Sequence, residues 1–469
     1  MSNVTLHPGD NRVTLRRLID EGVRVHSVVT DPPYGLVSIQ KRFGKEGAKN
    51  ARTEGNDGSF ARLSGGFMGK AWDGSGIERD PEFWALIYEI LLPGGYVFAF
   101  SGSRTGHWQA CAMEMAGFVM HPMHGWVFGS GFPKAHNAAR AVDRAMGVTR
   151  EVIGSQKAPG FAKSNVEHGQ QGRETWEFPV YDDNPVTPEA AQWEGWAYGT
   201  QTQKPALEPI YLGQKPFDSK TGAANLLKHG VGAANIDGCR VAAEAGRPWR
   251  QPSHVVGGNS LSGSADGSLG NEIADKSHMG RHPANLILDG SPEVVAMFPD
   301  SKGQQGDLKA HGKARQSPNG IFGAMRPALD HPARNDSGSA ARFFHHFPPD
   351  ADPVFYHPKA GKTDRAGSKH PTVKPIALMQ YLIRHITPPG GVVLDPFAGS
   401  GTTAEAARRE GFDCILMEAE PEYLDFLRDR FGVPVEQPVP AFDFDDILGE
   451  AMPTSSTPCG TDHIFGDLL

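Results

Sequence analysis

The apolar residues in the first part of the chain alternate between strand-like and helix-like spacing. Residues 25–30 (VHSVVT) form a short apolar run that ends at two prolines, which predicts a buried strand followed by a turn. A helix is predicted over residues 81–92, which begin with proline and end at the helix stop Pro-Gly-Gly. Strands are predicted at 96–100 and 126–129, with a helix near 105–116 between them.

The same alternation returns near the C-terminus. Apolar residues fall on one helical face over residues 376–386, and strands are predicted at 391–395 and 414–417. Helices are predicted at 402–410 and from Pro421 to Gly432. Strands that alternate with helices indicate an α/β fold built on a doubly wound, largely parallel sheet.

Between these regions the periodicity fades and Gly, Pro and Ser dominate, most of all at residues 257–272. We therefore expect four parts. Residues 1–135 and 366–435 would form the two halves of one α/β domain, and residues 136–365 a loop-rich insertion. Residues 436–469 form an acidic tail that we expect to be flexible.

Composition narrows the class of protein. The chain has 469 residues, of which 39% are hydrophobic, so it can bury a full core. It has no run of about 18 apolar residues and no apolar N-terminal stretch, so we expect a soluble, cytoplasmic protein with no membrane partner. Its four cysteines are far apart, which argues against a disulfide framework and a zinc module.

The distribution of charge matters more than its sum. The net charge of −8 argues against a polyanionic partner, but residues 436–469 carry seven acids and no Lys or Arg, which leaves about −1 for the rest. Residues 302–342 hold seven basic and three acidic residues, a local charge of +4. This basic segment is either a solvated loop or a surface for phosphate groups.

A glycine-rich loop follows the strand predicted at 391–395. In this loop, DPFAGSGTT, the absence of a Cβ at Gly399 and Gly401 lets a ligand approach the N-terminus of the next helix. The loop lacks the third glycine of the GxGxxG motif, which argues against a dinucleotide as the ligand. The alternative is that the loop is only a tight turn. Glu418 ends the next strand and could accept hydrogen bonds from a ribose diol, which implies a nucleoside-containing cofactor; the alternative is a solvent-facing Glu.

The turn Asp31-Pro32-Pro33-Tyr34 is the most specific signal in the chain. It places a carboxylate, carbonyl groups outside strand pairing and an aromatic ring in one rigid turn. The exocyclic amino group of a nucleobase could donate to Asp31 and to a proline carbonyl while the base stacks on Tyr34. Such contacts require a base that is flipped out of its duplex.

Together these motifs resemble the amino-methyltransferases of DNA, in which a DPPY turn and an FxGxG loop bind the target base and S-adenosyl-L-methionine. The order of the motifs, with DPPY first and a long insertion before FxGxG, resembles the beta group of these enzymes. The likeness extends to the segments GKAWDGSGI, LLPGGYVFAFSGSRT, WVFGSGFPKA, FYHPKAG and KHPTVKP. It implies a Rossmann-like, seven-stranded S-adenosylmethionine-dependent methyltransferase sheet, with a target-recognition region at 136–365.

The resemblance also assigns residues to roles. The catalytic turn comprises Asp31, Pro32, Pro33 and Tyr34. The cofactor-binding residues are Asp395, Phe397, Gly399, Gly401, Thr402, Glu418, Thr372 and Lys374, the last two near the methionine end of the cofactor. We expect Lys309, Lys313 and Arg315 of the basic segment to contact DNA. No metal is expected, and the pair His345-His346, with His357 nearby, is interpreted as a packed segment.

The implied activity is methylation of the N6 amino group of adenine in double-stranded DNA. Asp is commoner at the first position of the turn in the adenine enzymes, whereas the cytosine-N4 enzymes more often carry Ser there. A cytosine-N4 enzyme stays an alternative, as do an RNA or protein amino-methyltransferase and a catalytically silent DNA-binding protein. Because an ordinary Asp is a weak base, Asp31 is expected to position and stabilise the amino group rather than deprotonate it fully. A homodimer and a cognate restriction endonuclease stay open as partners.

Overall fold

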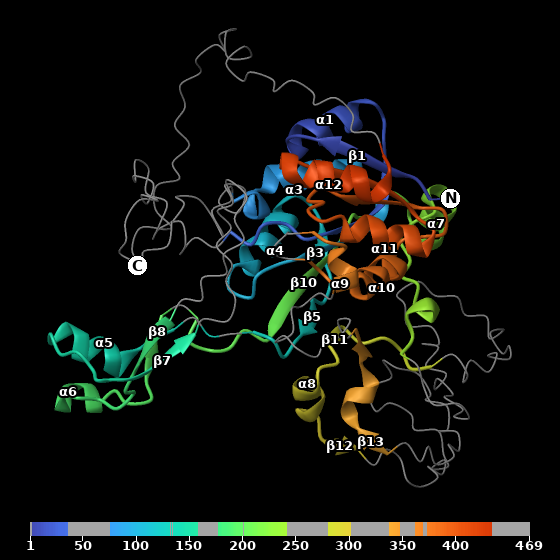
Figure 1. Cartoon of the computed structure of the whole chain (residues 1–469). Coiled ribbons are helices and arrows are strands. Elements are labelled where there is room, and N and C mark those ends of the chain that lie inside the picture. The colour runs from blue at the N-terminus through green and yellow to red at the C-terminus, as the bar shows by residue number, and fades with distance from the viewer. Residues whose placement is uncertain are drawn as a thin grey trace, which may run out of the picture.

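The central feature of the structure is a mainly parallel sheet that carries helices on both faces (Figure 1). The computed structural model describes residues 2–35, 76–131, 133, 135–157, 177–199, 201–241, 280–301, 337–347, 362–368 and 373–433. Within them, the predicted α/β fold class is confirmed. None of the helices in these ranges has the length and apolar character to cross a membrane.

Among the described residues the sheet has ten strands. Nine follow the order β1-β16-β15-β2-β3-β10-β5-β11-β14, and β4 pairs with β10. Their bounds are Val4–Pro8 (β1), Asp413–Glu418 (β16), Val392–Asp395 (β15), Val25–Thr30 (β2), Leu91–Phe100 (β3), Leu207–Gln214 (β10), His124–Val127 (β5), Leu286–Leu288 (β11), His345–His346 (β14) and Val119–Met120 (β4). All neighbouring pairs are parallel except those of β10, which runs antiparallel to β3, β4 and β5.

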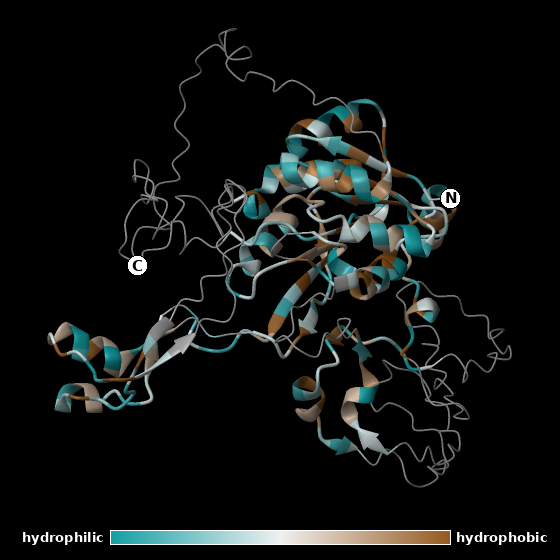
Figure 2. Ribbon diagram, in the orientation of Figure 1, coloured by the Kyte–Doolittle hydropathy of each residue, from teal (hydrophilic) through white to brown (hydrophobic). Residues whose placement is uncertain are grey.

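In the described part of the chain, six helices build the outer layers. Those on one side are α10 (Ile376–Ile386), α11 (Thr402–Glu410) and α12 (Pro421–Phe431), and those on the other are α1 (Asn11–Asp20), α3 (Pro81–Ile90) and α4 (Gly106–Met115). The strands serve both layers because their side chains alternate, so that Val28 faces the α3 side and Val29 the α10 side. In Figure 2 these helices carry both hydrophobic and hydrophilic residues, as expected when one helix face is buried.

Local sequence explains where the helices begin. Asp10 caps α1 by accepting a hydrogen bond from the backbone N–H of Arg12, and Asp80 caps α3, which begins at Pro81. The predicted helix over 81–92 ends at Ile90, because Leu91 already pairs with Val25 in the sheet. The strand and helix predicted at 391–395 and 402–410 are confirmed as β15 and α11.

The sheet has more strands than the resemblance implied, because the segment 136–365 contributes β10, β11 and β14. The strand β10 was not predicted from its sequence, LEPIYLGQ, in which a proline disfavours a central strand. Its residues Ile210 and Leu212 are buried in the core layer that also contains α10, and this burial outweighs the local preference. The boundaries at 135 and 366 therefore do not separate the sheet from the insertion.

The other described elements of the segment 136–365 lie outside the sheet. Figure 1 shows a projecting lobe of β6 (His136–Asn137), α5 (Ala138–Ala145), β7 (Val152–Lys157), β8 (Glu177–Tyr181), α6 (Pro188–Ala191) and β9 (Ala197–Tyr198). A second group comprises α8 (Pro292–Ala296), β12 (Asp300–Ser301) and β13 (Gly338–Ser339). The other helices within the described ranges are α7 (Gly222–His229), α9 (Lys362–Arg365), η3 (Ile77–Arg79), η4 (Asp237–Cys239) and η6 (Ala340–Phe343).

Candidate active site

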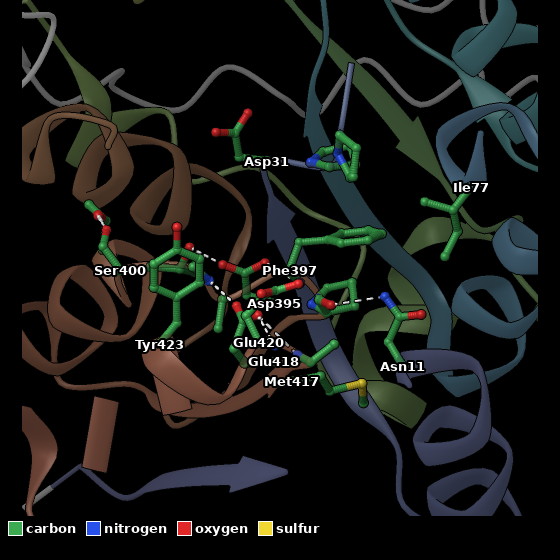
Figure 3. Close-up of a pocket in the computed structure, with 18 of the residues that line it drawn as sticks. Asn11, Asp31, Ile77, Asp395, Phe397, Ser400, Met417, Glu418, Glu420 and Tyr423 are labelled. Carbon is green, nitrogen blue, oxygen red and sulfur yellow. Dashed lines mark hydrogen bonds between the residues drawn. The ribbon is translucent and has the colours of Figure 1, made fainter. Parts of the chain in front are cut away.

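A cavity of about 420 Å³ lies at the carboxyl ends of four parallel strands, β1, β2, β15 and β16. Much of its wall comes from residues at the end of each strand or directly after it: 9–12, 31–34, 395–400 and 417–420. Figure 3 shows Asp31, Phe397 and Glu418 on the wall of this one cavity. Ligands of open α/β sheets bind at this edge, so the fold brings the DPPY turn and the glycine-rich loop together as the sequence predicted.

The glycine-rich loop is held to the end of β16 by Glu418. Its carboxylate accepts hydrogen bonds from the backbone N–H groups of Gly399 (2.7 Å), Ala419 (2.9 Å) and Glu420 (2.9 Å). Burial raises the pKa of Glu418 to about 7, although these three donors act in the opposite direction. A carboxylate has about four acceptor positions, so Glu418 can still accept from a ligand hydroxyl group.

Asp395 joins the two motifs inside the protein. It is 2% exposed, and it accepts hydrogen bonds from the hydroxyl groups of Thr30 (2.7 Å) and Thr403 (2.5 Å) and from the N–H of Phe397 (3.1 Å). Thr30 ends β2 directly before the DPPY turn, so Asp395 sets the distance between that turn and the loop. Burial raises the pKa of Asp395 to about 6.

Of the other predicted residues of the loop, two line the cavity and one packs in the core. Phe397 and Thr402 line the cavity, and the Phe397 ring packs on Phe83 with 5.3 Å between centroids. Gly401 instead faces α12, where a Cβ would lie 2.5 Å from Leu427 Cδ2. Its φ of 75° also disfavours a side chain. Helix packing therefore explains this glycine.

The DPPY turn is fixed by its own tyrosine and by the loop that follows β3. The Tyr34 hydroxyl donates to Asp31 Oδ1 at 2.9 Å, and the Thr105 hydroxyl donates to the carbonyl of Tyr34 at 2.6 Å. Pro32 and Pro33 line the cavity beside them. Burial raises the pKa of Asp31, against the lowering effect of the Lys374 ammonium, and burial also raises the pKa of Tyr34.

Lys374 contacts the DPPY turn directly. Its Nζ donates to Asp31 Oδ2, lies 3.1 Å from the Tyr34 hydroxyl and 3.8 Å from Glu208 Oε2. The resemblance placed Lys374 near the methionine end of the cofactor, and in the structure its ammonium group contacts the carboxylate of Asp31 in the DPPY turn. Thr372 lies outside the described residues.

Sequence reasoning missed several residues of the cavity. Asn11 donates from Nδ2 to the carbonyl of Pro396 at 3.0 Å, and the signal that could have found it is the pair Gly9-Asp10 directly before it. Ile77 and Tyr423 add apolar surface. Glu208 lies on β10, and nothing in the local sequence marked it, because only the pairing of β10 with β3 brings it to the cavity.

The remaining candidates lie elsewhere. Lys309, Lys313, Arg315 and His357 are outside the described residues. The Nε2 atoms of His345 and His346 lie 2.7 Å and 2.9 Å from the carbonyl oxygens of Cys239 and Ala341, so this pair is packed as predicted. Burial raises the pKa of the Cys239 thiol to about 12, which makes it a structural cysteine.

Several known proteins are similar to this chain. The Type II methyltransferase M2.DpnII of Streptococcus pneumoniae is 45% identical over 69 residues, which are 15% of this chain and 26% of that protein. The chain thus matches about a quarter of the length of this relative. Among solved structures, the M1.HpyAVI–SAM complex is 14% identical with a TM-score of 0.34, and the match covers 91% of this chain and 99% of that one. The PvuII DNA methyltransferase, described as cytosine-N4-specific, is 14% identical with a TM-score of 0.36, covering 95% and 90%.

A family model described as DNA methylase, N6_N4_Mtase, matches residues 25–429. The match begins at the first residue of β2 and ends within α12, so it includes the DPPY turn, the inserted segment and the glycine-rich loop. The cofactor of this family is S-adenosylmethionine, as predicted. The chain belongs to this N6/N4 family of S-adenosylmethionine-dependent DNA methylases.

Proposed function

We propose that this chain is a site-specific DNA methyltransferase that transfers a methyl group from S-adenosylmethionine to the N6 amino group of adenine. The observation that carries the proposal is that Asp31 and Glu418 line one cavity. The first is suited to a nucleobase amino group and the second to a ribose, so a base and a nucleoside cofactor could meet there. The relative in Streptococcus pneumoniae, a Type II methyltransferase, supports the same class of activity.

The residues of the cavity fit the cofactor. Glu418 keeps acceptor capacity for a ribose hydroxyl group, and Gly399, with a φ of 51°, presents backbone without a side chain. Phe397, Ile77 and Met417 supply apolar surface for a purine ring. When bound, S-adenosylmethionine would supply an activated methyl group on a sulfonium.

The DPPY turn would hold the acceptor. Asp31 and the carbonyl of Pro32 can accept the two hydrogens of an exocyclic amino group, which directs the nitrogen lone pair away from them. The ring of Tyr34 can stack on the base. Asp31 then acts by position and charge, because its hydrogen bonds from Tyr34 and Lys374 keep the carboxylate fixed in the cavity.

The choice of adenine rests on Asp31 at the first position of the turn. Adenine and cytosine both present an amino group beside a ring nitrogen, so the acceptors of the turn suit either base. The test is to express the protein in a host without DNA methylation, digest the DNA to nucleosides and identify the products by mass. N6-methyladenine is expected. Detection of N4-methylcytosine alone would overturn the choice of base. Absence of both methylated nucleosides would overturn the proposed activity.

The proposed substrate is double-stranded DNA, with target recognition by the segment 136–365 and phosphate contacts by Lys309, Lys313 and Arg315. A net charge of +4 over residues 302–342 supports this placement. A homodimer and a cognate restriction endonuclease stay predictions of the resemblance.

A further inference from the structure

Three charged side chains meet at the base end of the cavity, and they come from three separate parts of the chain. Asp31 follows β2, Glu208 lies on β10 and Lys374 precedes α10. Their side chains are 17%, 10% and 5% exposed. The Lys374 ammonium is paired with Asp31, lies 3.8 Å from Glu208 Oε2 and sits 4.8 Å from the centroid of the Phe100 ring. Charges this poorly solvated interact strongly.

The ion pair creates a problem for the chemistry proposed above. During transfer the nitrogen lone pair forms the new N–C bond while the electrons of the S–C bond return to sulfur. A unit of positive charge therefore moves from sulfur to the amino nitrogen, which afterwards loses a proton to water. A carboxylate beside that nitrogen stabilises the arriving charge. Asp31 paired with Lys374 alone would be a neutral couple, which provides much less stabilisation.

Glu208 resolves this problem. When it is included, the charges of the three side chains sum to −1, so the subsite keeps a net negative charge. Asp395 is a further acid nearby, but its carboxylate already accepts hydrogen bonds from Thr30, Thr403 and the N–H of Phe397. None of these donors comes from Asp31, Lys374 or Glu208, so substitutions at those three positions leave the hydrogen-bond donors of Asp395 in place. The charge of the base subsite is thus set by Asp31, Lys374 and Glu208.

We propose that Glu208 is a positioning residue of the methyl transfer, which acts through Lys374 and keeps the base subsite at a net charge of −1. Lys374 holds the Asp31 carboxylate in place, and Glu208 offsets the charge that Lys374 introduces. The inference rests on the proposed methyltransferase function but not on the choice of base, because the amino groups of adenine and cytosine acquire the same charge.

The experiment compares Glu208→Gln, Lys374→Met and the double variant with the wild-type protein and with Glu114→Gln. Glu114 is exposed on α4 and does not line the cavity, so it is the matched control. The rate of tritium transfer to DNA is measured in a single turnover with saturating cofactor and DNA, and cofactor affinity is measured separately. Tritium transfer by the wild-type protein is recorded first, so failure of the proposed function is recognised independently.

We expect Glu208→Gln to slow transfer by about tenfold to a hundredfold with cofactor affinity nearly unchanged. At a pH above the raised pKa of Asp31, removal of Lys374 as well leaves the ionised Asp31 and a net charge of −1, so the double variant should be faster than Glu208→Gln alone. If Glu208 has only a structural role, the losses of transfer rate in the two single variants should instead add in the double variant. Wild-type speed in Glu208→Gln, or a double variant slower than either single variant, would overturn the proposal.

A second comparison covers the case in which the double variant does not fold. Glu208→Asp keeps the negative charge but shortens the side chain. Glu208→Gln keeps the shape of the side chain but removes its charge. If the charge matters, the Asp variant should transfer at least several times faster than the Gln variant. Equal rates in the two variants would contradict the proposal.

Discussion

Asp31 and Lys374 lie 343 positions apart in the chain, and their side chains form an ion pair inside the cavity. Asp31 belongs to the turn proposed to hold the target base, and Lys374 lies two residues after Thr372 in the element HPTVKP. The pair links the two halves of the α/β domain at the site of the proposed reaction. It also makes the carboxylate of Asp31 less mobile than a solvated acid would be.

Replacement of Asp31 by Ala should abolish methyl transfer, with a loss of about a hundredfold or more, and leave cofactor affinity within a few fold. The reason is that Asp31 is assigned to the base, whereas Glu418 and Gly399 are assigned to the cofactor. Equilibrium binding of S-adenosylmethionine and tritium transfer to DNA measure the two effects. A variant that keeps most of its turnover would refute the assignment of Asp31.

Replacement of Gly399 by Val should mainly weaken cofactor binding, because a β-branched side chain would enter the cavity beside Glu418. Gly411→Val is the matched control. Gly411 has a positive φ of 82° but ends α11 away from the cavity, so it reports backbone strain alone. Both variants should lose about 1–2 kcal/mol of stability, and only Gly399→Val should lose cofactor affinity. Equal cofactor affinities in the two variants would argue against the placement of Gly399.

The stability of the protein should fall between pH 6.5 and 4 partly because of His385. Burial lowers its pKa from 6.5 to about 4, so over this range the unfolded chain binds a proton that the folded chain excludes. The neutral ring packs against Phe98 and Tyr381, near His282 and His345, whose charges oppose protonation further. His385→Phe should therefore flatten the fall in melting temperature below pH 6.5. An unchanged pH profile would show that His385 does not contribute.

Replacement of Lys309, Lys313 and Arg315 by Ala should reduce the salt dependence of DNA binding. Each lost phosphate contact lowers the slope of log affinity against log salt by about 0.9, so three contacts would account for about 2.7. Titrations of DNA at several salt concentrations give this slope. If the slope of the triple variant equals that of the wild-type protein, the basic segment is merely solvated.

The projecting lobe offers a test of the proposed target-recognition region. Asp143 is 1% exposed and accepts hydrogen bonds from Arg150 Nε (2.9 Å), the Thr187 hydroxyl (2.8 Å) and the Thr187 N–H (3.1 Å). Asp143→Ala should loosen the lobe, which hydrogen exchange over residues 136–199 would detect, and should weaken DNA binding but not cofactor binding. The control is Asp183→Ala, since the Asp183 side chain forms an exposed ion pair with Arg140, and its backbone carbonyl, which accepts from Arg150, is kept in the variant. Unchanged DNA affinity in a loosened lobe would place target recognition elsewhere.

The sequence by itself determined the α/β class, the strand before the DPPY turn and the loop after β15. These features are local. Two prolines after an apolar run end the strand, because proline cannot donate to strand pairing. Glycines at the junction after a strand leave the backbone uncovered, because they carry no Cβ. The resemblance also implied that the DPPY turn and the glycine-rich loop would bind the two partners of one methyl transfer, and the parallel strands present both motifs at one edge of the sheet.

Only the tertiary structure decided the role of Gly401, the position of Lys374 and the presence of Glu208. Gly401 belongs to the same glycine-rich loop as Gly399, but a Cβ at Gly401 would meet Leu427 of α12. Glu208 reaches the cavity because β10 inserts antiparallel between β3 and β5, although its proline disfavours a central strand. The physical reason is that the free energy of such contacts comes from burial between elements distant in sequence, which no local pattern records.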